Sequence, residues 1–233
     1  MRLVIFDVDG TLVDSQGDIV ASMAAAFAAI GRNAPTRQEV LGIVGLSLPV
    51  AMHQLAPDAD NDLLVTTYKE CYARLRVEKG ASSSPLYPGA RAALDRLNAR
   101  DDLLLGVATG KSKRGLDGLI EAHGLDGLFI TQQVADFHPS KPHPSMLQAA
   151  MADAGVEAKD AVMIGDTSFD ADMARAADMP FIGVSWGYHP VPLLNGAHRI
   201  LNDFAELDDA LGALWAECHE RMEPKAVLEN RSD

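Results

Sequence analysis

Short apolar runs recur along the chain, and most of them are continuous rather than alternating with polar residues. They lie at residues 3–6, 103–108, 128–131, 161–164 and 181–184. Continuous runs of this length are typical of strands buried on both faces of a parallel sheet. Between the later runs lie amphipathic segments of helical length, at about 89–100, 112–123, 144–154 and 169–178. This alternation predicts βαβ units, and therefore an α/β fold with a parallel sheet.

The stretch from about residue 15 to residue 86 interrupts this alternation. Its pattern predicts helices at 18–30, 37–44, 49–55 and 62–78, and we interpret it as an all-helical insert after the first strand. The linkers near 13–16 and 81–89 carry small and turn-forming residues that can act as hinges. We therefore predict a core domain of residues 1–14 and 88–222, with a last helix at about 205–220. The inserted domain is predicted at 15–87 and a polar tail at 223–233.

Charge and hydropathy narrow the classes of function. The chain has 233 residues, with 33 acidic against 20 basic side chains and a net charge of −13. This balance argues against nucleic-acid binding, which depends on basic surfaces. Because the chain shows neither an apolar run near the ~18 residues of a membrane helix nor a signal-peptide pattern, we expect no membrane partner and a cytoplasmic location. An anionic substrate would then need a local lysine, backbone N–H groups or a metal ion.

Two aspartates follow the first predicted strand, in the sequence Asp7-Val8-Asp9-Gly10-Thr11. Ligands of open α/β sheets bind beyond the carboxyl ends of the strands. Side chains two residues apart on an extended chain point to the same side, so one carboxylate can attack while the other moves protons. The plainer interpretation is a solvated turn, in which Asp and Gly are common.

A second acidic pair follows the strand predicted at 161–164, where Asp166 and Asp170 flank the start of a helix. Each aspartate alone is explained as a helix N-cap. Together with Asp7 and Asp9 they predict a cluster of oxygen ligands of the kind that Mg²⁺ prefers.

Two further segments are candidates for binding an anion. Thr109 and Gly110 end the second predicted strand, where a hydroxyl and backbone N–H groups can hold a phosphate. Taken alone, this segment is better explained as a plain helix cap, because such caps are frequent. Lys141 lies between prolines in a stiff segment, so it is either a fixed positive charge beside the carboxylates or an exposed lysine in a turn.

These segments, in this order, resemble the four motifs of the haloacid dehalogenase superfamily. The motifs are Asp7 to Thr11, Thr109-Gly110, Lys141 and Asp166 to Asp170. The helical insert resembles the cap of that family, as found in phosphoglycolate phosphatases and their β-phosphoglucomutase relatives. The resemblance implies a Rossmann-like, doubly wound parallel sheet carrying an inserted all-helical cap.

The resemblance also implies a role for each matched residue. Asp7 would be the nucleophile that forms an aspartyl-phosphate, and Asp9 would protonate the leaving alcohol and then activate water. Lys141 would offset the charge on Asp7 and the phosphoryl group. The phosphate ligands would be Thr109, Gly110 and Lys141, and Mg²⁺ would be held by Asp7, the backbone carbonyl of Asp9, Asp166 and Asp170.

We therefore expect a Mg²⁺-dependent phosphatase that acts on a small phosphorylated metabolite, with phosphoglycolate as the first candidate. One alternative is a β-phosphoglucomutase-like enzyme, in which Asp9 returns the phosphate to a sugar instead of water. The other is a non-catalytic protein that keeps the fold as a binding scaffold. The pattern fits a monomer or a homodimer.

Overall fold

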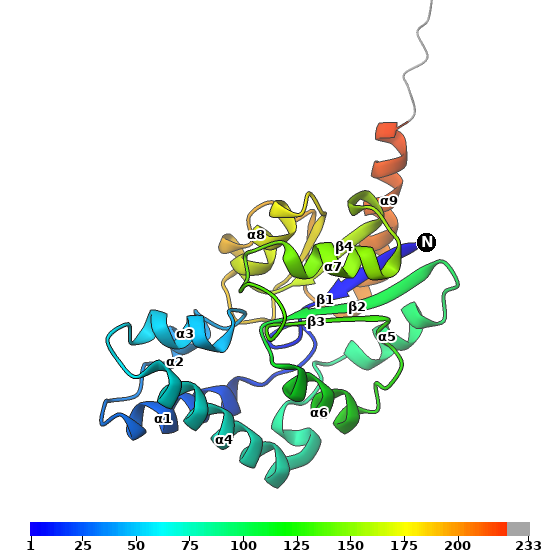
Figure 1. The fold of residues 1–233 in the computed structure, drawn as a ribbon. Helices are drawn as coiled ribbons and strands as arrows, with labels where there is room; N and C mark the ends of the chain where they lie inside the picture. The colour runs from blue at the N-terminus through cyan, green and yellow to red at the C-terminus, as the bar shows by residue number, and fades with distance from the viewer. Residues whose placement is uncertain (223–233) are drawn as a thin grey trace, which may run out of the picture.

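A six-stranded parallel sheet organises the computed structural model, which describes residues 1–222 (Figure 1). The predicted polar tail, 223–233, lies outside the described residues. The strand order is β3-β2-β1-β4-β5-β6, so the first strand lies at the centre of the sheet. The strands are β1 (Arg2–Phe6), β2 (Leu103–Thr109), β3 (Thr131–Val134), β4 (Ala161–Gly165), β5 (Phe181–Val184) and β6 (Arg199–Leu201). The fold is thus the doubly wound, Rossmann-like arrangement expected from the sequence.

Both faces of the sheet are covered by helices, as the continuous apolar runs require. Val4 and Phe6 of β1 belong to one buried cluster and Leu3 and Ile5 belong to another, because successive side chains of a strand point to opposite faces. The first face packs against α5 (Ala90–Asn98), α6 (Lys113–His123) and α9 (Leu207–Met222), and the second against α7 (Ser145–Ala154) and α8 (Ser168–Ala176).

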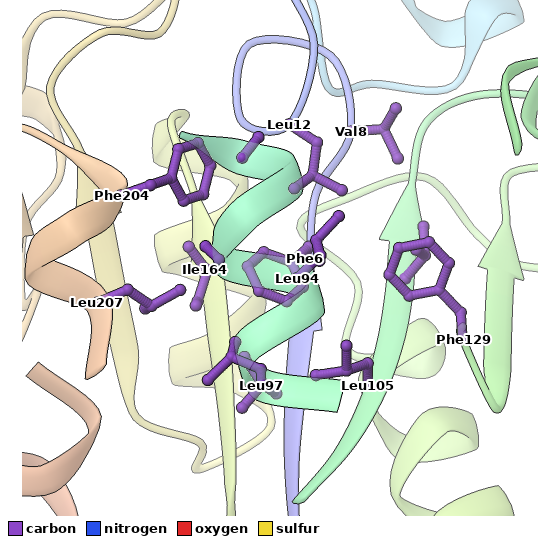
Figure 2. Close-up of a cluster of buried hydrophobic side chains, with 14 of the residues drawn as sticks. Phe6, Val8, Leu12, Leu94, Leu97, Leu105, Phe129, Ile164, Phe204 and Leu207 are labelled. Carbon is purple, nitrogen blue, oxygen red and sulfur yellow. The ribbon is translucent and has the colours of Figure 1, made fainter. Parts of the chain in front are cut away.

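The α5 helix illustrates how this packing fixes the sheet. Figure 2 shows Leu94 and Leu97 of α5 lying against the strands that carry Phe6 and Leu105. Leu94, Leu97 and Phe6 have no exposed surface. Burying one such side chain contributes roughly 1.5–3 kcal/mol relative to leaving it in water. A sheet held this firmly gives the strand ends fixed positions.

Four helices between β1 and α5 form a separate group, which we call the cap (Figure 1). They are α1 (Gln16–Ala29), α2 (Arg37–Leu41), α3 (Leu48–Leu55) and α4 (Asn61–Lys79). Their apolar faces meet in a cluster of their own, which includes Met23, Met52 and Leu64, all nearly or fully buried. The domain division at 14/15 and 87/88 stays a prediction, but this independent cluster is consistent with it.

Two sequence predictions are wrong in detail, and one strand is missing from the sequence predictions. The strand expected at 128–131 begins only at Thr131, and it is polar because it lies at the edge of the sheet. The other edge strand, β6, was not predicted, since three residues give too short a pattern. The helix expected at 37–44 ends at Leu41, and the chain then continues through turns. Among the described helices, none combines the length and apolar content required to span a bilayer.

Candidate active site

Neighbouring strands bring the predicted motifs to one edge of the sheet. The chain leaves β1 at Asp7, ends β2 at Thr109 and leaves β4 at Asp166. The β1 strand pairs in parallel with both β2 and β4, so all three strands end on the same side. Paired strands lie about 4.8 Å apart, which places side chains at their ends within contact distance.

Lys141 lies between two of the aspartates. Its Nζ atom is 2.8 Å from Asp7 Oδ1 and 2.6 Å from Asp170 Oδ1. Lys141 is 1 % exposed, so the interpretation as an exposed lysine in a turn does not hold. A lysine is almost never buried unless it is paired, and here both carboxylates pair with it. The residue thus supplies a fixed positive charge at this site.

Asp166 is fixed by hydrogen bonds to both of its oxygens. The Thr11 hydroxyl donates to Asp166 Oδ1 over 2.9 Å, and the Tyr188 backbone N–H donates to Oδ2 over 2.7 Å. Gly10 passes directly over this carboxylate at φ +89°, and a Cβ atom there would lie 2.2 Å from Asp166 Oδ2. Both the positive φ and the close approach explain why glycine follows Asp9.

Asp170 combines two functions at the start of α8. Its Oδ2 accepts hydrogen bonds from the Thr167 N–H (3.1 Å) and from the Thr167 hydroxyl (2.7 Å), which completes a capping box. Its Oδ1 is left to contact Lys141. Thr167 is the N-cap of α8 and Asp170 is the third helical residue, so Asp170 caps the helix through the capping box rather than as the N-cap itself. Its other oxygen faces the site, where it pairs with Lys141.

Burial and mutual repulsion shift the pKa values of Asp7 and Asp166. Burial and the nearby charge of Asp170 raise the pKa of Asp7 and Lys141 opposes them, so that the pKa is raised to about 7. Burial also raises the pKa of Asp166 well above its ordinary value, with Asp7 and Asp170 adding repulsion. For Lys141, burial acts to lower the pKa, but Asp170 and Asp7 outweigh it, so the pKa is raised. One lysine is thus too little positive charge for three buried carboxylates.

The three carboxylates fit a divalent cation. Oxygen atoms of Asp7, Asp166 and Asp170 lie within 4.8 Å of one another. Asp7 Oδ2 is buried and has no hydrogen-bond partner. An unsatisfied buried carboxylate oxygen costs free energy, and a cation coordinated by hard oxygen ligands removes that cost. We call Asp7, Asp166, Asp170 and Lys141 the carboxylate floor.

The Asp9 side chain faces a different partner. Lys111 Nζ lies 2.7 Å from Asp9 Oδ1 and 2.8 Å from Oδ2, and the Ser15 hydroxyl donates to Oδ1. Burial acts to lower the pKa of Lys111, but Asp9 and Tyr72 outweigh it and raise the pKa. The Asp9 carboxylate is therefore held beside the carboxylate floor by a second lysine.

Sequence reasoning missed Lys111 and Ser15 as site residues. Lys111 follows Thr109 and Gly110 directly, and its place after the end of a central strand was an available signal. Ser15 was treated only as part of a linker, and nothing in its sequence context links it to Asp9.

Thr109 and Gly110 lie where the second motif predicts them. The Thr109 hydroxyl oxygen accepts a hydrogen bond from the Lys111 N–H over 3.2 Å, so the hydroxyl proton remains available for another acceptor. A Cβ atom on Gly110 would lie 2.6 Å from the Leu46 carbonyl oxygen and 2.7 Å from that of Gly45. Glycine is thus needed for the cap loop to approach the core here.

Polar contacts also join the cap to the core. The Ser47 N–H donates to Ser140 Oγ over 2.8 Å, and Arg76 donates to the Arg114 carbonyl over 3.1 Å. Lys111 Nζ contacts the Tyr72 hydroxyl over 3.2 Å. Between these contacts lies a cavity of about 660 Å³, lined by the cap and by core residues that include Asp7, Asp9 and Thr109. This volume is within the usual range of small-molecule sites.

Taken together, the structure gathers most of the predicted site residues around one cavity. Asp7, Lys141, Asp166 and Asp170 form the carboxylate floor. Asp9 and Thr109 line the same cavity without joining the carboxylate cluster through their side chains. The role of the Asp9 backbone carbonyl as a metal ligand stays a prediction.

Comparisons with known proteins agree with this geometry. The family model described as "Haloacid dehalogenase-like hydrolase" matches residues 4–184. A protein of Dickeya dadantii named "Probable phosphatase IndB" is 35% identical, covering 91% of this chain and 94% of the relative. A phosphoglycolate phosphatase of Agrobacterium fabrum is 33% identical, covering 90% and 91%. The crystal structure of a hydrolase from Pseudomonas syringae superposes with a TM-score of 0.80 at 25% identity, covering 91% of this chain and 99% of that one.

Proposed function

The chain belongs to the haloacid dehalogenase-like hydrolase family as a phosphatase, and we propose that it hydrolyses small-molecule phosphomonoesters with Mg²⁺ through an aspartyl-phosphate on Asp7. The observation that carries this proposal is the position of Lys141 between Asp7 and Asp170, 2.8 Å and 2.6 Å from them. Phosphoryl transfer depends mainly on positioning and on neutralising spread-out negative charge, and the carboxylate floor supplies both.

In the first step a carboxylate oxygen of Asp7 attacks the phosphorus atom. The bond between phosphorus and the ester oxygen breaks, and Asp9 gives its proton to the departing alkoxide. Asp7 Oδ1 is held by Lys141, whereas Asp7 Oδ2 has no hydrogen-bond partner. The Thr109 hydroxyl, whose oxygen already accepts from Lys111 N–H, is free to donate to a phosphoryl oxygen.

In the second step water replaces Asp7. Asp9, now ionised, takes a proton from the water as it attacks phosphorus, and the bond between phosphorus and Asp7 breaks. Asp7 is regenerated as a carboxylate, Asp9 regains its proton, and inorganic phosphate leaves. Lys111 and Ser15 hold the Asp9 carboxylate in place for both proton transfers.

Asp7, Asp166 and Asp170 would hold Mg²⁺, because their oxygens lie within 4.8 Å of one another and Asp7 Oδ2 is unsatisfied. Bound there, Mg²⁺ would offset the negative charge of the phosphoryl group and so lower the reaction barrier by several kcal/mol. The hydrogen bonds from Thr11 and Tyr188 fix the orientation of Asp166 for this task.

The direct test replaces the nucleophile. We expect Asp7→Asn to reduce phosphate release from p-nitrophenyl phosphate by a factor of at least about 10⁴, because an amide oxygen is a poor nucleophile and cannot form the intermediate. Asp14→Asn is the matched control, since Asp14 accepts a hydrogen bond from Gln16 and lies outside the carboxylate floor. Undiminished turnover by Asp7→Asn would overturn the proposal.

The reaction products distinguish a hydrolase from the β-phosphoglucomutase-like alternative. With β-glucose 1-phosphate the hydrolase releases inorganic phosphate, whereas a mutase forms glucose 6-phosphate. A failure to release phosphate from any ester in a broad panel with Mg²⁺ would favour the scaffold alternative. Phosphoglycolate belongs in that panel, because several relatives carry the name phosphoglycolate phosphatase.

A further inference from the structure

Most of the residues that the cap contributes to the cavity lining are apolar. These residues come from α1, from the loop that leads into α3, from α3 itself and from α4. We call this surface the cap wall, and it consists of Ile19, Met23, Ile43, Leu46, Leu48 and Tyr68. It borders the same cavity as Asp7, the residue of the carboxylate floor that lines this cavity, so an ester bound to Asp7 would extend its leaving group toward the cap wall.

Two stacked tyrosines make one part of this surface rigid. The rings of Tyr68 and Tyr72 lie 5.9 Å apart at an angle of 15°. The Tyr72 hydroxyl contacts Ser84 Oγ over 3.1 Å as well as Lys111 Nζ. Burial raises the pKa of Tyr68 well above its ordinary value, so its ring stays uncharged. A preformed aromatic surface loses little entropy when a ligand packs against it.

The cationic residues that line the cavity are Lys69, Arg76, Lys111 and Arg114. Arg76 donates to the carbonyls of Arg114 and Gly115, and Lys111 is paired with Asp9. Lys69 and Arg114 are exposed residues at the margin. A second anionic group on the leaving alcohol would therefore meet side chains that are exposed to water or a guanidinium that already donates to two carbonyls. An apolar group would instead meet the cap wall, which loses contact with water when such a group packs against it.

We propose that this cavity selects phosphomonoesters whose leaving alcohol is uncharged and carries an aromatic or aliphatic group that packs against the cap wall. This inference rests on the proposed phosphatase function and adds the substrate class. A two-carbon acid such as glycolate would fill a small part of about 660 Å³. An alcohol bearing a ring would occupy more of that volume and bury the apolar surface that the cap wall presents.

The test compares esters of primary alcohols that differ only in what they present to the cap wall. We expect kcat/KM for 2-phenylethyl phosphate to exceed that for ethyl phosphate and for phosphoglycolate by roughly 10- to 100-fold, since each well-packed apolar group contributes to transition-state binding. A kcat/KM for phosphoglycolate equal to or above that for 2-phenylethyl phosphate overturns this inference and leaves the phosphatase standing. Release of phosphate from none of the three, nor from p-nitrophenyl phosphate, overturns the proposed function itself.

Two variants in α3 test whether the preference for 2-phenylethyl phosphate over ethyl phosphate arises at the cap wall. Leu48 begins α3 and lines the cavity, whereas Leu55 ends α3 and packs on the cap cluster outside the cavity lining; both are half-buried. We expect Leu48→Gln to lower the ratio of kcat/KM for 2-phenylethyl phosphate to kcat/KM for ethyl phosphate about fivefold. Leu55→Gln should leave the ratio of the two esters unchanged. An equal loss for both esters in Leu48→Gln, or an unchanged ratio, would contradict the assignment.

Discussion

The carboxylate floor, through Asp7, and the cap wall border one cavity, and the two differ in composition. The floor places Asp7 and Asp166 at the ends of buried strands, Asp170 in the first turn of α8 and Lys141 in the loop before α7, each 1 % exposed or less. The wall is contributed by helices and a loop that pack in a separate apolar cluster. The core holds the charged groups, and the cap supplies the surface that a substrate contacts. The chemistry and the choice of substrate therefore depend on different parts of the chain.

The two regions also differ in what holds them in place. Removing one partner from a buried ion cluster leaves an unpaired charge and is strongly destabilising. Replacing one side chain of an apolar surface costs less, because neighbours repack around it. Substitutions in the carboxylate floor should therefore change kcat and stability, while those in the cap wall should change the order of preferred substrates.

The largest effect should come from Lys141→Met. It leaves Asp7 and Asp170 without their common partner, so we expect kcat to fall by about 10³ and the free energy of unfolding to fall by about 3–5 kcal/mol. Denaturant unfolding and phosphate release measure the two losses. Lys113→Met is the matched control, because Lys113 pairs with Asp117 on the surface of α6. Equal effects of the two substitutions would contradict the role of Lys141.

A smaller loss is expected for Lys111→Met, which sharpens the comparison because Lys111 lies between the two regions. It contacts Asp9 beside the floor and Tyr72, whose ring stacks on Tyr68 of the wall. Without Lys111 the Asp9 carboxylate keeps Ser15 but loses its cationic partner. We expect kcat to fall by about 10- to 100-fold. Hydrolysis of the aspartyl-phosphate should also be slower, because Asp9 donates the proton in the first step and accepts one in the second. Lys113→Met again serves as control, and wild-type kcat in Lys111→Met would show that Asp9 needs no such partner.

Thr11→Val should act through the metal. The Thr11 hydroxyl donates to Asp166 over 2.9 Å, and partners of this kind orient the ligands of a cation. We expect the Mg²⁺ concentration for half-maximal activity to rise about tenfold with kcat at saturating Mg²⁺ little changed. Thr11→Ser keeps the hydroxyl and should remain close to wild type. An unchanged Mg²⁺ requirement in Thr11→Val would argue against Asp166 as a ligand.

The smallest effect concerns pH and thermal stability. The pKa of Asp7 is raised to about 7 in the folded, metal-free protein, above its value of 3.8 in an unfolded chain. A raised carboxyl pKa favours the folded state at low pH, and this contribution is lost as pH rises from about 4 to 7. Mg²⁺ binds the ionised carboxylates, so it should raise Tm by about 5 °C at pH 8 and by clearly less at about pH 5.5.

Scanning calorimetry with and without Mg²⁺ makes this measurement. Asp14→Asn should keep the pH dependence of the Mg²⁺ shift, because Asp14 lies outside the carboxylate floor. A Tm shift that is the same at both pH values, or larger at the acidic one, would contradict the assignment of Mg²⁺ to these carboxylates.

Sequence patterns predicted the centre of the fold better than its edges. The runs at 161–164 and 181–184 correspond closely to β4 and β5, because buried strands need continuous apolar residues. The edge strand β3 reads Thr-Gln-Gln-Val and lacks that signal. The motif aspartates stood out because they follow strands. The sequence around Lys141 predicts neither its burial nor its pairing with Asp7, which is 134 residues away, because both depend on tertiary contacts.

The central claim is that Asp7 itself accepts the phosphoryl group, and trapping the intermediate tests it most directly. Wild-type protein mixed with Mg²⁺ and a rapidly cleaved aryl phosphate, then quenched in acid within one turnover, is digested and analysed by mass spectrometry. We expect the peptide that contains Asp7 to be heavier by one phosphoryl group, and the same peptide from Asp7→Asn to be unmodified. A phosphoryl group found on another residue, or none on any peptide while phosphate is still released in that turnover, would contradict the account.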